Sequence, residues 1–342
     1  MNKIKVGFGP ETTANSFYQS GVKVAGLLNE DDRFECIFFK EPMEYGSLSK
    51  FDILIFIKIA PSAEVLKRLK SAGKILILDY QDMFLFPSVY EQNYIKKVLK
   101  KIYYFGLEAR EKQRYANFDC CLVSSPASEK IVTESGMKPY FIFRQIYNDW
   151  NREHPKVHSD KTSELTILWT GVPLNLGQNK PVEPILQKIY RKHRSRVIYL
   201  TQLPERKEGG IEYKRWSVET WEKELLQADI AFRWWEKSND QYHKDSNKII
   251  SYMAAGLPVV CRPTAADKLV IEHGKTGFFA ETISEFEQYI EKLIVYPQLR
   301  REIGNSAFKE VWSKYSLDKH VEELKKIILN LRDECHRNKA NG

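Results

Sequence analysis

The sequence predicts an α/β fold made of two Rossmann-like domains that face each other across a cleft. Short apolar runs recur along the chain, and helical patterns separate most of them. The runs are continuously apolar rather than alternating, which is typical of parallel strands that helices cover on both faces. The chain has 342 residues and is 43% hydrophobic, so it exceeds the size that one core usually supports. Because ligands of such sheets lie outside the carboxyl ends of the strands, we expect the functional loops at the cleft.

The first domain, residues 1–147, contains six predicted strands. They cover residues 4–8, 34–39, 53–57, 75–78, 120–123 and 140–143. The segment GFGPETTANSF places Gly9 and Glu11 after the first strand, where Glu11 is a candidate for the cleft. The segment LDYQDMF places Asp79 and Asp82 at the end of the fourth strand. Asp82 is the preferred candidate for a general base, and a capping aspartate is the alternative interpretation.

The polar segment 148–164, NDWNREHPKVHSDKTSE, is interpreted as a linker to a second domain over residues 165–317. Its predicted strands cover residues 165–170, 197–200, 211–216, 229–234, 259–261 and 277–280. The final segment, 318–342, has apolar residues at helical spacing, so we expect a C-terminal helix that packs back towards the first domain. These residues are Val321, Leu324, Ile327, Ile328 and Leu331.

The composition argues against several kinds of protein and favours anionic partners. No run of about 18 apolar residues exists and the first residues enter a strand pattern, so we expect a cytoplasmic protein without a signal peptide. The five cysteines are scattered and form no CxxC pair, which argues against disulfides and zinc. The sequence has neither an HExxH nor a DxD motif, so neither a metal nor another cofactor is expected. The net charge of +8 favours phosphorylated ligands, anionic lipid or nucleic acid as partners.

Residues 94–104, YIKKVLKKIYY, predict a basic amphipathic helix. Lysines occupy one helical face and apolar side chains the other. The lysines are Lys96, Lys97, Lys100 and Lys101, and the apolar residues are Ile95, Val98, Leu99 and Ile102. Peripheral docking onto the inner face of an anionic membrane and an ordinary solvated surface helix are both consistent with this pattern.

The segment DSNKIISYMAAGLPVV, residues 245–260, predicts a short helix whose amino end binds an anion. Ser246 is a good N-cap, and Gly256 and Pro258 end the helix. Lys248 falls in the first turn, where the helix dipole disfavours a cation unless an anion binds beside it. A phosphate site is therefore the functional interpretation, and a solvated lysine is the alternative.

Four segments of the second half resemble, in order, the nucleotide-sugar-binding half of glycosyltransferases with the GT-B fold, and most closely their group 1 (family four) members. They are TILWTG at 166–171, KRWSVETWEKELLQADIAF at 214–232, NKIISYMAAGLPVV at 247–260 and HGKTGFFA at 273–280. The resemblance implies transfer of a sugar from a nucleotide-sugar to a hydroxyl of a glycan or lipid-linked acceptor. It also suggests a role in cell-surface polysaccharide biosynthesis without a metal ion.

The resemblance assigns roles to particular residues of this chain. In this interpretation Gly171 lets the backbone approach phosphate, Trp216 packs on the nucleobase, and the loop FRWWEKSNDQYHKDSN lines the cleft. Candidate donor-binding residues are Gly171, Lys180, Trp216, Ser217, Arg233, Ser246, Asn247 and Lys248, with Glu236 as a further loop candidate. Candidate catalytic residues are Asp82 and His243, and candidate acceptor-binding residues are Gly9 and Glu11.

The chain departs from the family pattern at two positions. The large retaining family has two glutamates eight positions apart, and this chain has His243 and Ser251 there. Donor identity and stereochemical course therefore stay open. Alternative functions are a sugar-nucleotide epimerase of the same architecture, a non-catalytic nucleotide-sugar-binding protein, and a nucleic-acid-binding module. Nucleic acid is not the expected partner, because the lysines are dispersed and no recognition motif occurs.

Overall fold

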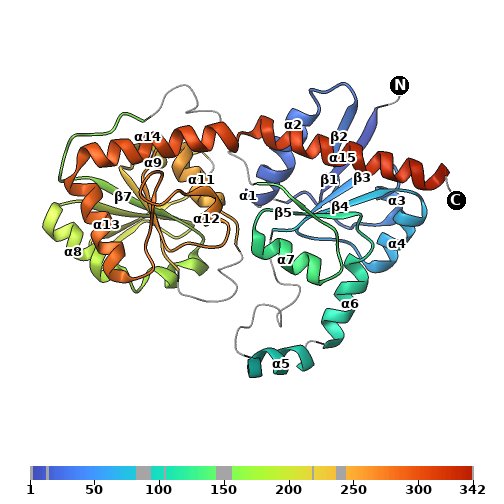
Figure 1. Ribbon diagram of the computed structural model, residues 1–342, viewed down its shortest axis with the longest axis horizontal. Coiled ribbons are helices and arrows are strands. Elements are labelled where there is room, and N and C mark those ends of the chain that lie inside the picture. Colours follow the sequence, from blue (N-terminus) through green and yellow to red (C-terminus); the bar gives the residue numbers. More distant parts are fainter. Residues whose placement is uncertain are drawn as a thin grey trace. The chain divides into compact units, whose positions relative to one another are not determined.

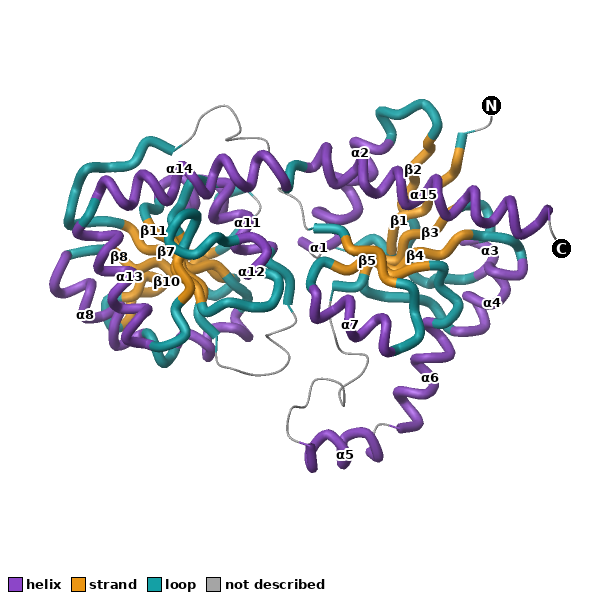
Figure 2. The backbone as a smooth tube through the Cα atoms, viewed as in Figure 1, coloured by secondary structure: helices purple, strands orange, loops and turns teal. Residues whose placement is uncertain are grey.

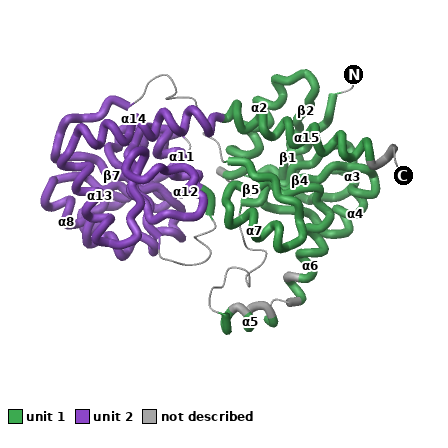
Figure 3. Tube along the Cα trace, in the orientation of Figure 1, with its two compact units in different colours: residues 1–147, 243–245, 317–342 green, residues 148–242, 246–316 purple. Residues whose placement is uncertain are grey.

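The computed structural model describes residues 3–12, 15–81, 94–103, 105–143, 156–217, 219–235 and 244–340. The chain forms two compact units (Figure 3). Unit 1 comprises residues 1–147, 243–245 and 317–342, and unit 2 comprises residues 148–242 and 246–316. Within each unit the strands lie in the centre and the helices lie outside (Figure 2).

Unit 1 contains a six-stranded parallel sheet with the order β2-β1-β3-β4-β5-β6 (Figure 1). The strands are β1 Ile4–Gly9, β2 Phe34–Phe38, β3 Ile53–Ile57, β4 Ile75–Asp79, β5 Cys120–Val123 and β6 Pro139–Phe141. The helices are α1 Asn15–Phe17, the π-helix η1 Tyr18–Lys23, α2 Val24–Leu28, α3 Tyr45–Leu48, α4 Ala63–Ser71, α5 Tyr94–Tyr103, α6 Phe105–Tyr115, α7 Pro126–Glu134 and α15 Leu317–Ala340.

Alternate residues of each central strand of unit 1 enter two different hydrophobic clusters, as expected for a sheet covered on both faces. On β4, Ile75 and Ile77 belong to the cluster that α2 and α15 complete. Leu76 and Leu78 belong to the cluster that α4 and α7 complete. The apolar side chains of α15, which include Leu324 and Ile328, are buried in the first cluster. The C-terminal helix is therefore part of the core of unit 1.

Unit 2 contains a seven-stranded sheet with the order β13-β12-β11-β7-β8-β10-β9. The strands are β7 Thr166–Thr170, β8 Arg196–Thr201, β9 Arg206–Glu208, β10 Ile211–Arg215, β11 Ile230–Arg233, β12 Val259–Cys261 and β13 Phe278–Phe279. The helices are the 3₁₀-helix η2 Pro173–Asn179, α8 Glu183–His193, α9 Trp221–Gln227, α11 Asn247–Ala254, α12 Asp267–Val270, α13 Ile283–Val295 and α14 Pro297–Lys314. All pairs are parallel except that of β9 with β10. The predicted α/β fold with two Rossmann-like units is thus confirmed.

The edge strand β9 is the element that sequence reasoning missed. Its residues, Arg-Lys-Glu, are polar and exposed, so neither an apolar run nor an alternating pattern marks them. Only the backbone pairing with β10 creates this strand. A short charged edge strand also leaves little template for pairing with another chain.

Residues 156–161, which fall in the predicted linker, are fastened to unit 2. The fully buried guanidinium of Arg300 donates to the carbonyl oxygens of Ser159 and Lys161 at 2.5 and 2.7 Å, and to two carbonyls at the end of α13. Lys156 Nζ donates to the Leu226 carbonyl at 2.7 Å. His158 is buried against Gly304 of α14, where a Cβ would lie 2.5 Å from the imidazole. This segment is therefore part of the packing of unit 2.

Candidate active site

The predicted donor residues gather at the carboxyl edge of the sheet in unit 2. Gly171 follows β7, Arg233 ends β11 and Trp216 follows β10. The strand β7 lies between β11 and β8, so the chain winds outwards from β7 in both directions. Such a topological switch point is where open α/β sheets bind ligands. The helix α11, which carries Lys248, runs from this edge.

Gly171 and Lys248, predicted separately to contact phosphate, lie beside each other. A Cβ on Gly171 would lie 3.0 Å from Lys248 Nζ and 2.4 Å from the indole of Trp169. The Lys248 ammonium also lies 5.5 Å from the centre of the Trp169 ring, in a cation–π contact. Only glycine fits at position 171 without displacing the buried indole. The absence of a side chain leaves the loop backbone open next to a fixed positive charge.

Tyr252, one helical turn after Lys248, ties α11 to the end of β7. Its hydroxyl accepts a hydrogen bond from the Thr170 amide at 2.8 Å and lies 3.0 Å from the Thr170 hydroxyl. Burial of the whole side chain raises the pKa of Tyr252 above its usual value. Because residues four apart share a helix face, Tyr252 and Lys248 both face the β7–Gly171 turn. The phenol therefore fixes the loop against the helix that carries the cation.

Ser246 occupies the N-cap position of α11, but the predicted side-chain cap is wrong. Its hydroxyl makes no capping bond and instead donates to Asp267 Oδ1 at 2.8 Å. Asp267 is completely buried, and it also accepts from the Thr264 amide at 2.6 Å and pairs with the Arg233 guanidinium. A buried carboxylate requires several donors, and a charge-assisted hydrogen bond is stronger than a neutral cap. The hydroxyl is drawn to Asp267 for this reason.

Asp267 and Tyr252 are residues of this edge that sequence reasoning missed. The only signal for Asp267 was a carboxylate that follows the buried strand β12 at a short distance. Arg233, predicted to bind the donor, has its guanidinium engaged by this carboxylate. Arg262, which follows β12, lies 4.9 Å from the Trp234 ring centre and donates to the Trp235 carbonyl at 3.2 Å. The edge thus carries the cations Arg233, Lys248 and Arg262, and Arg233 pairs with the buried carboxylate of Asp267.

Trp216, Ser217 and Lys180 lie at other points of the same edge. Trp216 is half-buried, and its amide donates to the Thr201 carbonyl at 2.8 Å. The Ser217 hydroxyl lies 2.9 Å from that of Thr220, in the turn before α9. Lys180 is exposed at the end of η2, and its charge opposes the burial that raises the pKa of Glu183. None of these contacts joins the three residues to Lys248, so their donor roles stay predictions.

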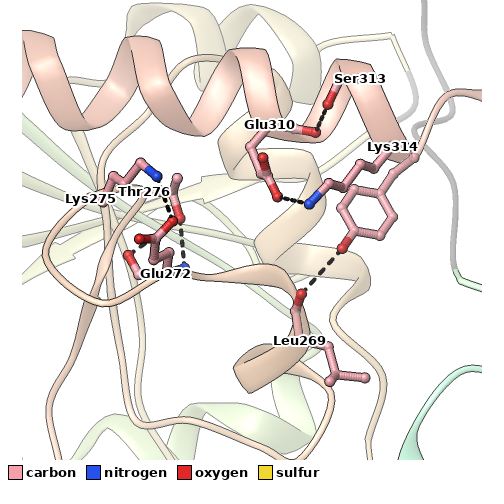
Figure 4. A network of polar contacts seen from close by, with 8 residues as sticks. Leu269, Glu272, Lys275, Thr276, Glu310, Ser313 and Lys314 are labelled. Atoms are coloured by element: carbon pink, nitrogen blue, oxygen red, sulfur yellow. Dashed lines mark hydrogen bonds and ion pairs between the residues drawn. The ribbon is translucent and has the colours of Figure 1, made fainter.

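The HGKTG segment is a turn held by its own hydrogen bonds (Figure 4). The Thr276 hydroxyl accepts from the Glu272 amide at 2.8 Å, and Lys275 Nζ pairs with the Glu272 carboxylate at 2.8 Å. Gly274 has φ of +78°, which favours glycine. Glu310 and Lys314 of α14 form a separate ion pair close by. The turn connects α12 to β13, and His273 Nδ1 accepts from the Phe279 amide of β13 at 3.0 Å.

Candidates in unit 1 have structural partners where they are described. A Cβ on Gly9 would lie 2.6 Å from the Phe39 ring and from the Phe39 carbonyl oxygen, so packing alone requires glycine. The Glu11 carboxylate lies 3.4 Å from Lys40 Nζ. Asp82, Glu236 and His243 lie outside the described residues. Among the residues that are described, no group of three or more His, Cys, Asp or Glu is placed to hold a metal ion.

Residues 219–326 match a protein family described as glycosyl transferase-like. The match covers about a third of the chain. The match includes β11, α11 with Lys248, and Asp267. A protein of Xenopus tropicalis named glycosyltransferase 1 domain-containing protein 1 is 31% identical over 87 residues. This match spans 25% of the chain and 25% of that relative.

Several solved structures share the fold of this chain over nearly its whole length. HepE of Anabaena, in complex with UDP and glucose, has a TM-score of 0.65 at 11% identity and covers 96% of this chain and 100% of its own. A glycosyltransferase from Rickettsia africae has a TM-score of 0.66 at 13% identity, covering 97% and 99%. A putative UDP-N-acetylglucosamine 2-epimerase from Listeria monocytogenes has a TM-score of 0.59 at 12% identity, covering 97% and 98%. The shared fold is GT-B.

Proposed function

We propose that the protein is a glycosyltransferase that uses a nucleotide-sugar donor, with the donor pyrophosphate bound at the start of α11. The observation that carries the proposal is the contact of Lys248 Nζ with the Gly171 loop at the carboxyl edge of unit 2. Open backbone, a fixed ammonium and a helix amino end are three features that bind phosphate. The glycosyl transferase-like match over α11 and the UDP bound in HepE support a nucleoside diphosphate group as the ligand.

In this proposal Lys248 stabilises the diphosphate leaving group. Negative charge on the departing oxygen grows as the glycosidic bond breaks, so a pre-placed cation favours the transition state. The first-turn amides of α11, including that of Asn247, supply further donors. The reaction then needs no metal ion, and a chelator should leave turnover unchanged. Trp216 and Ser217 would contact the nucleoside, and Lys180 and Arg233 would add positive charge.

We assign the acceptor to unit 1, in which Gly9 ends the first strand and Glu11 follows it. The acceptor is a hydroxyl of a glycan or a lipid-linked sugar, as in cell-surface polysaccharide biosynthesis. Asp82 would deprotonate this hydroxyl in an inverting reaction. In a retaining reaction the departing phosphate would take the proton, and Asp82 would orient the substrate. His243 is the second catalytic candidate, and anomeric analysis of the product by NMR separates the two courses.

The test is titration calorimetry with UDP and UDP-sugars on wild-type protein and on Lys248→Ala. Loss of one charge-assisted contact should raise the dissociation constant roughly 10- to 100-fold. Lys268→Ala is the matched control, because Lys268 is an exposed lysine of α12 in the same unit. Equal affinities of wild type and Lys248→Ala for every nucleotide would remove the proposed donor site.

Product analysis decides between transfer and epimerisation. The Listeria protein shows that a putative epimerase can have the same fold. A transferase releases UDP only as fast as a new glycosidic bond or hydrolysed sugar appears. An epimerase interconverts the nucleotide-sugars without requiring an acceptor. Conversion of one UDP-sugar into another without release of UDP would therefore favour the epimerase.

We further propose that α5 docks onto the inner face of an anionic membrane, where a lipid-linked acceptor would lie. The apolar side chains of α5 are exposed: Ile95 by 69%, Leu99 by 60% and Ile102 by 69%. Tyr94 and Tyr103, at the two ends of the helix, are about four-fifths exposed. Insertion of this apolar face would add to the attraction of the lysines to anionic lipid, which contributes about 1 kcal/mol for each lysine near the surface. None of the helices within the described ranges is long and apolar enough to cross a bilayer.

Sedimentation with vesicles tests the docking of α5. Wild-type protein should sediment with vesicles that contain about 30% phosphatidylserine, because this content gives the surface a strong negative potential. It should not sediment with neutral phosphatidylcholine vesicles. Leu99→Glu should abolish sedimentation, because a charge would enter the apolar face. Val295→Glu, an equivalent change at a 42% exposed valine of α13, is the control. Equal sedimentation of wild type and Leu99→Glu would exclude α5 as the docking element.

A further inference from the structure

A polar network closes the carboxyl edge of the sheet in unit 1. Asp79 is the last residue of the central strand β4, and its side chain is 3% exposed. Alternation along β4 directs Asp79 to the same face as Ile75 and Ile77, the face that η1 and α2 cover. A buried carboxylate in this position requires hydrogen-bond donors. Gln81 supplies one, with Nε2 at 2.5 Å from Asp79 Oδ2.

The π-helix η1 provides the third member of the network. Gly21 of η1 lies so close to the sheet that a Cβ would meet Ile57 Cδ1 at 3.1 Å. This close approach brings the neighbouring residue, Ser20, to the strand ends, where its hydroxyl accepts from Gln81 Nε2 at 2.8 Å. Ser20 is 9% exposed. Single π-turns are rare and occur frequently at functional sites.

The chemistry of Asp79 fixes the orientation of the Gln81 amide. A carboxylate only accepts hydrogen bonds, so the amide nitrogen of Gln81, and not its oxygen, must face Asp79. Both N–H groups are then used, one towards Asp79 and the other towards Ser20. Within the described ranges both side-chain hydrogen bonds of Gln81 start from Nε2, and no residue there donates to Oε1. Gln81 is half-buried, so solvent reaches the side chain.

The backbone at this edge is also constrained. Lys58, which follows β3, has φ of +66°, and its amide donates to the Asp79 carbonyl at 3.1 Å. A non-glycine residue in the left-handed region costs free energy and occurs often at ligand sites. The neighbouring strand β4 therefore ends in a fixed conformation. The Lys58 amide thus holds the backbone of Asp79, and the side chains of Asp79 and Ser20 hold the amide nitrogen of Gln81.

We propose that Asp79, Gln81 and Ser20 form a hydroxyl-binding subsite for a sugar or polyol, in which Gln81 Oε1 accepts a hydrogen bond from a substrate hydroxyl. This proposal rests on the proposed function and names the part of unit 1 that holds the acceptor. An amide oxygen is too weak a base to remove a proton, so Gln81 orients the hydroxyl. Asp79 is a positioning residue that acts through Gln81.

Saturation-transfer NMR on the full chain tests the subsite, with methyl glucoside, galactoside, mannoside and N-acetylglucosaminide as probes. At least one glycoside should bind the wild type, and Gln81→Met, which is nearly isosteric, should weaken that binding roughly fivefold or more. Ser20→Ala, a milder change, should weaken it less and keeps the test valid if Gln81→Met folds poorly. Asp52→Asn is the control, because Asp52 accepts from the Lys5 amide at 2.9 Å at the opposite edge of the same sheet.

A fourth variant separates positioning from a merely structural role. In Asp79→Asn the new amide can donate, so Gln81 can turn its oxygen inwards and present Nε2 to the substrate. Glycoside binding should fall while the pH dependence of the residual binding stays that of the wild type. Retention of wild-type binding in Gln81→Met, or failure of every glycoside to bind, overturns the subsite.

Titration of UDP in parallel distinguishes this failure from failure of the proposed function. UDP binding that is lost in Lys248→Ala and kept in Gln81→Met supports the donor site whatever the glycosides do. Glycoside binding that depends on Gln81 in a protein that binds no UDP supports the subsite and contradicts the proposed function.

Discussion

Replacement of Gly171 by alanine tests the geometry of the candidate donor site. The new Cβ would lie 2.4 and 2.5 Å from two carbon atoms of the Trp169 indole and 3.0 Å from Lys248 Nζ. Trp169 is 2% exposed and lies within the core of unit 2, with Tyr199 at 5.2 Å between ring centres. The indole therefore has no open space into which to move. The ammonium of Lys248 must also shift by a few tenths of an ångström.

Overpacking of this kind typically lowers the free energy of unfolding by about 1–3 kcal/mol. For a unit of this size, each kcal/mol shifts the melting temperature by roughly 2–4 °C. Gly171→Ala should therefore melt several degrees below the wild type by calorimetry. It should also bind UDP more weakly, because the displaced Lys248 no longer lies beside the loop. The lower melting temperature and the weaker UDP binding share one cause, the clash of the new methyl group with Trp169 and Lys248, and a double variant tests this.

Trp169→Phe combined with Gly171→Ala should recover part of both losses, since the smaller ring leaves room for the new methyl group. Gly177→Ala is the matched control: Gly177 belongs to η2 in the same loop region, and a Cβ there meets nothing within 4 Å. A Gly171→Ala protein with wild-type melting temperature and UDP affinity would refute the packing argument.

Three further perturbations follow from the buried groups of unit 2. Burial, reinforced by Lys156 and Arg300, lowers the pKa of His158 from 6.5 to about 4, so unfolding takes up a proton. The free energy of unfolding is therefore highest above pH 6.5, and it decreases by about 3 kcal/mol as the pH falls towards 4. His158→Gln should flatten this dependence in urea titrations, and unchanged curves would contradict it. Tyr252→Phe leaves the Thr170 amide without its acceptor, so UDP affinity should fall severalfold with a loss of about 1 kcal/mol of stability. A Tyr252→Phe protein equal to wild type in both measurements would show that the phenol does not hold the loop. Asp267→Asn removes the charge that faces Arg233 and should destabilise unit 2 by about 3–5 kcal/mol, as measured by chemical denaturation. A loss below about 1 kcal/mol would mean that the pair is solvated.

Much of the fold was predictable from local patterns. The strands predicted from the sequence correspond to the six strands of unit 1 and to six of the seven strands of unit 2, and most of them are apolar runs that identify strands without knowledge of their partners. The seventh, β9, has no such run, because its stability comes from backbone pairing with β10. Strand order was not predictable at this level, since residues adjacent in the sheet, such as those of β7 and β11, are more than 60 residues apart in the sequence.

The candidate site was predictable to a smaller extent. Gly171 and Lys248 were chosen as a strand-end glycine and a first-turn lysine, and the structure brings them together. Their donor roles, like those of the other candidate residues, stay predictions. No sequence motif marked Asp267 or Gln81 as a residue of a site. Each matters because of partners that no spacing rule connects to it.

The sequence by itself determined the two-unit α/β fold and the helix α11, which begins at Asn247, because both follow from the local order of apolar and helix-ending residues. The tertiary structure alone decided how the polar groups were used. Ser246 gives its hydroxyl to Asp267, 21 residues away, and Arg233 pairs with the same carboxylate across 34 residues. The reason is desolvation: a buried charge takes the strongest donors within reach, and only the folded chain sets which donors are in reach.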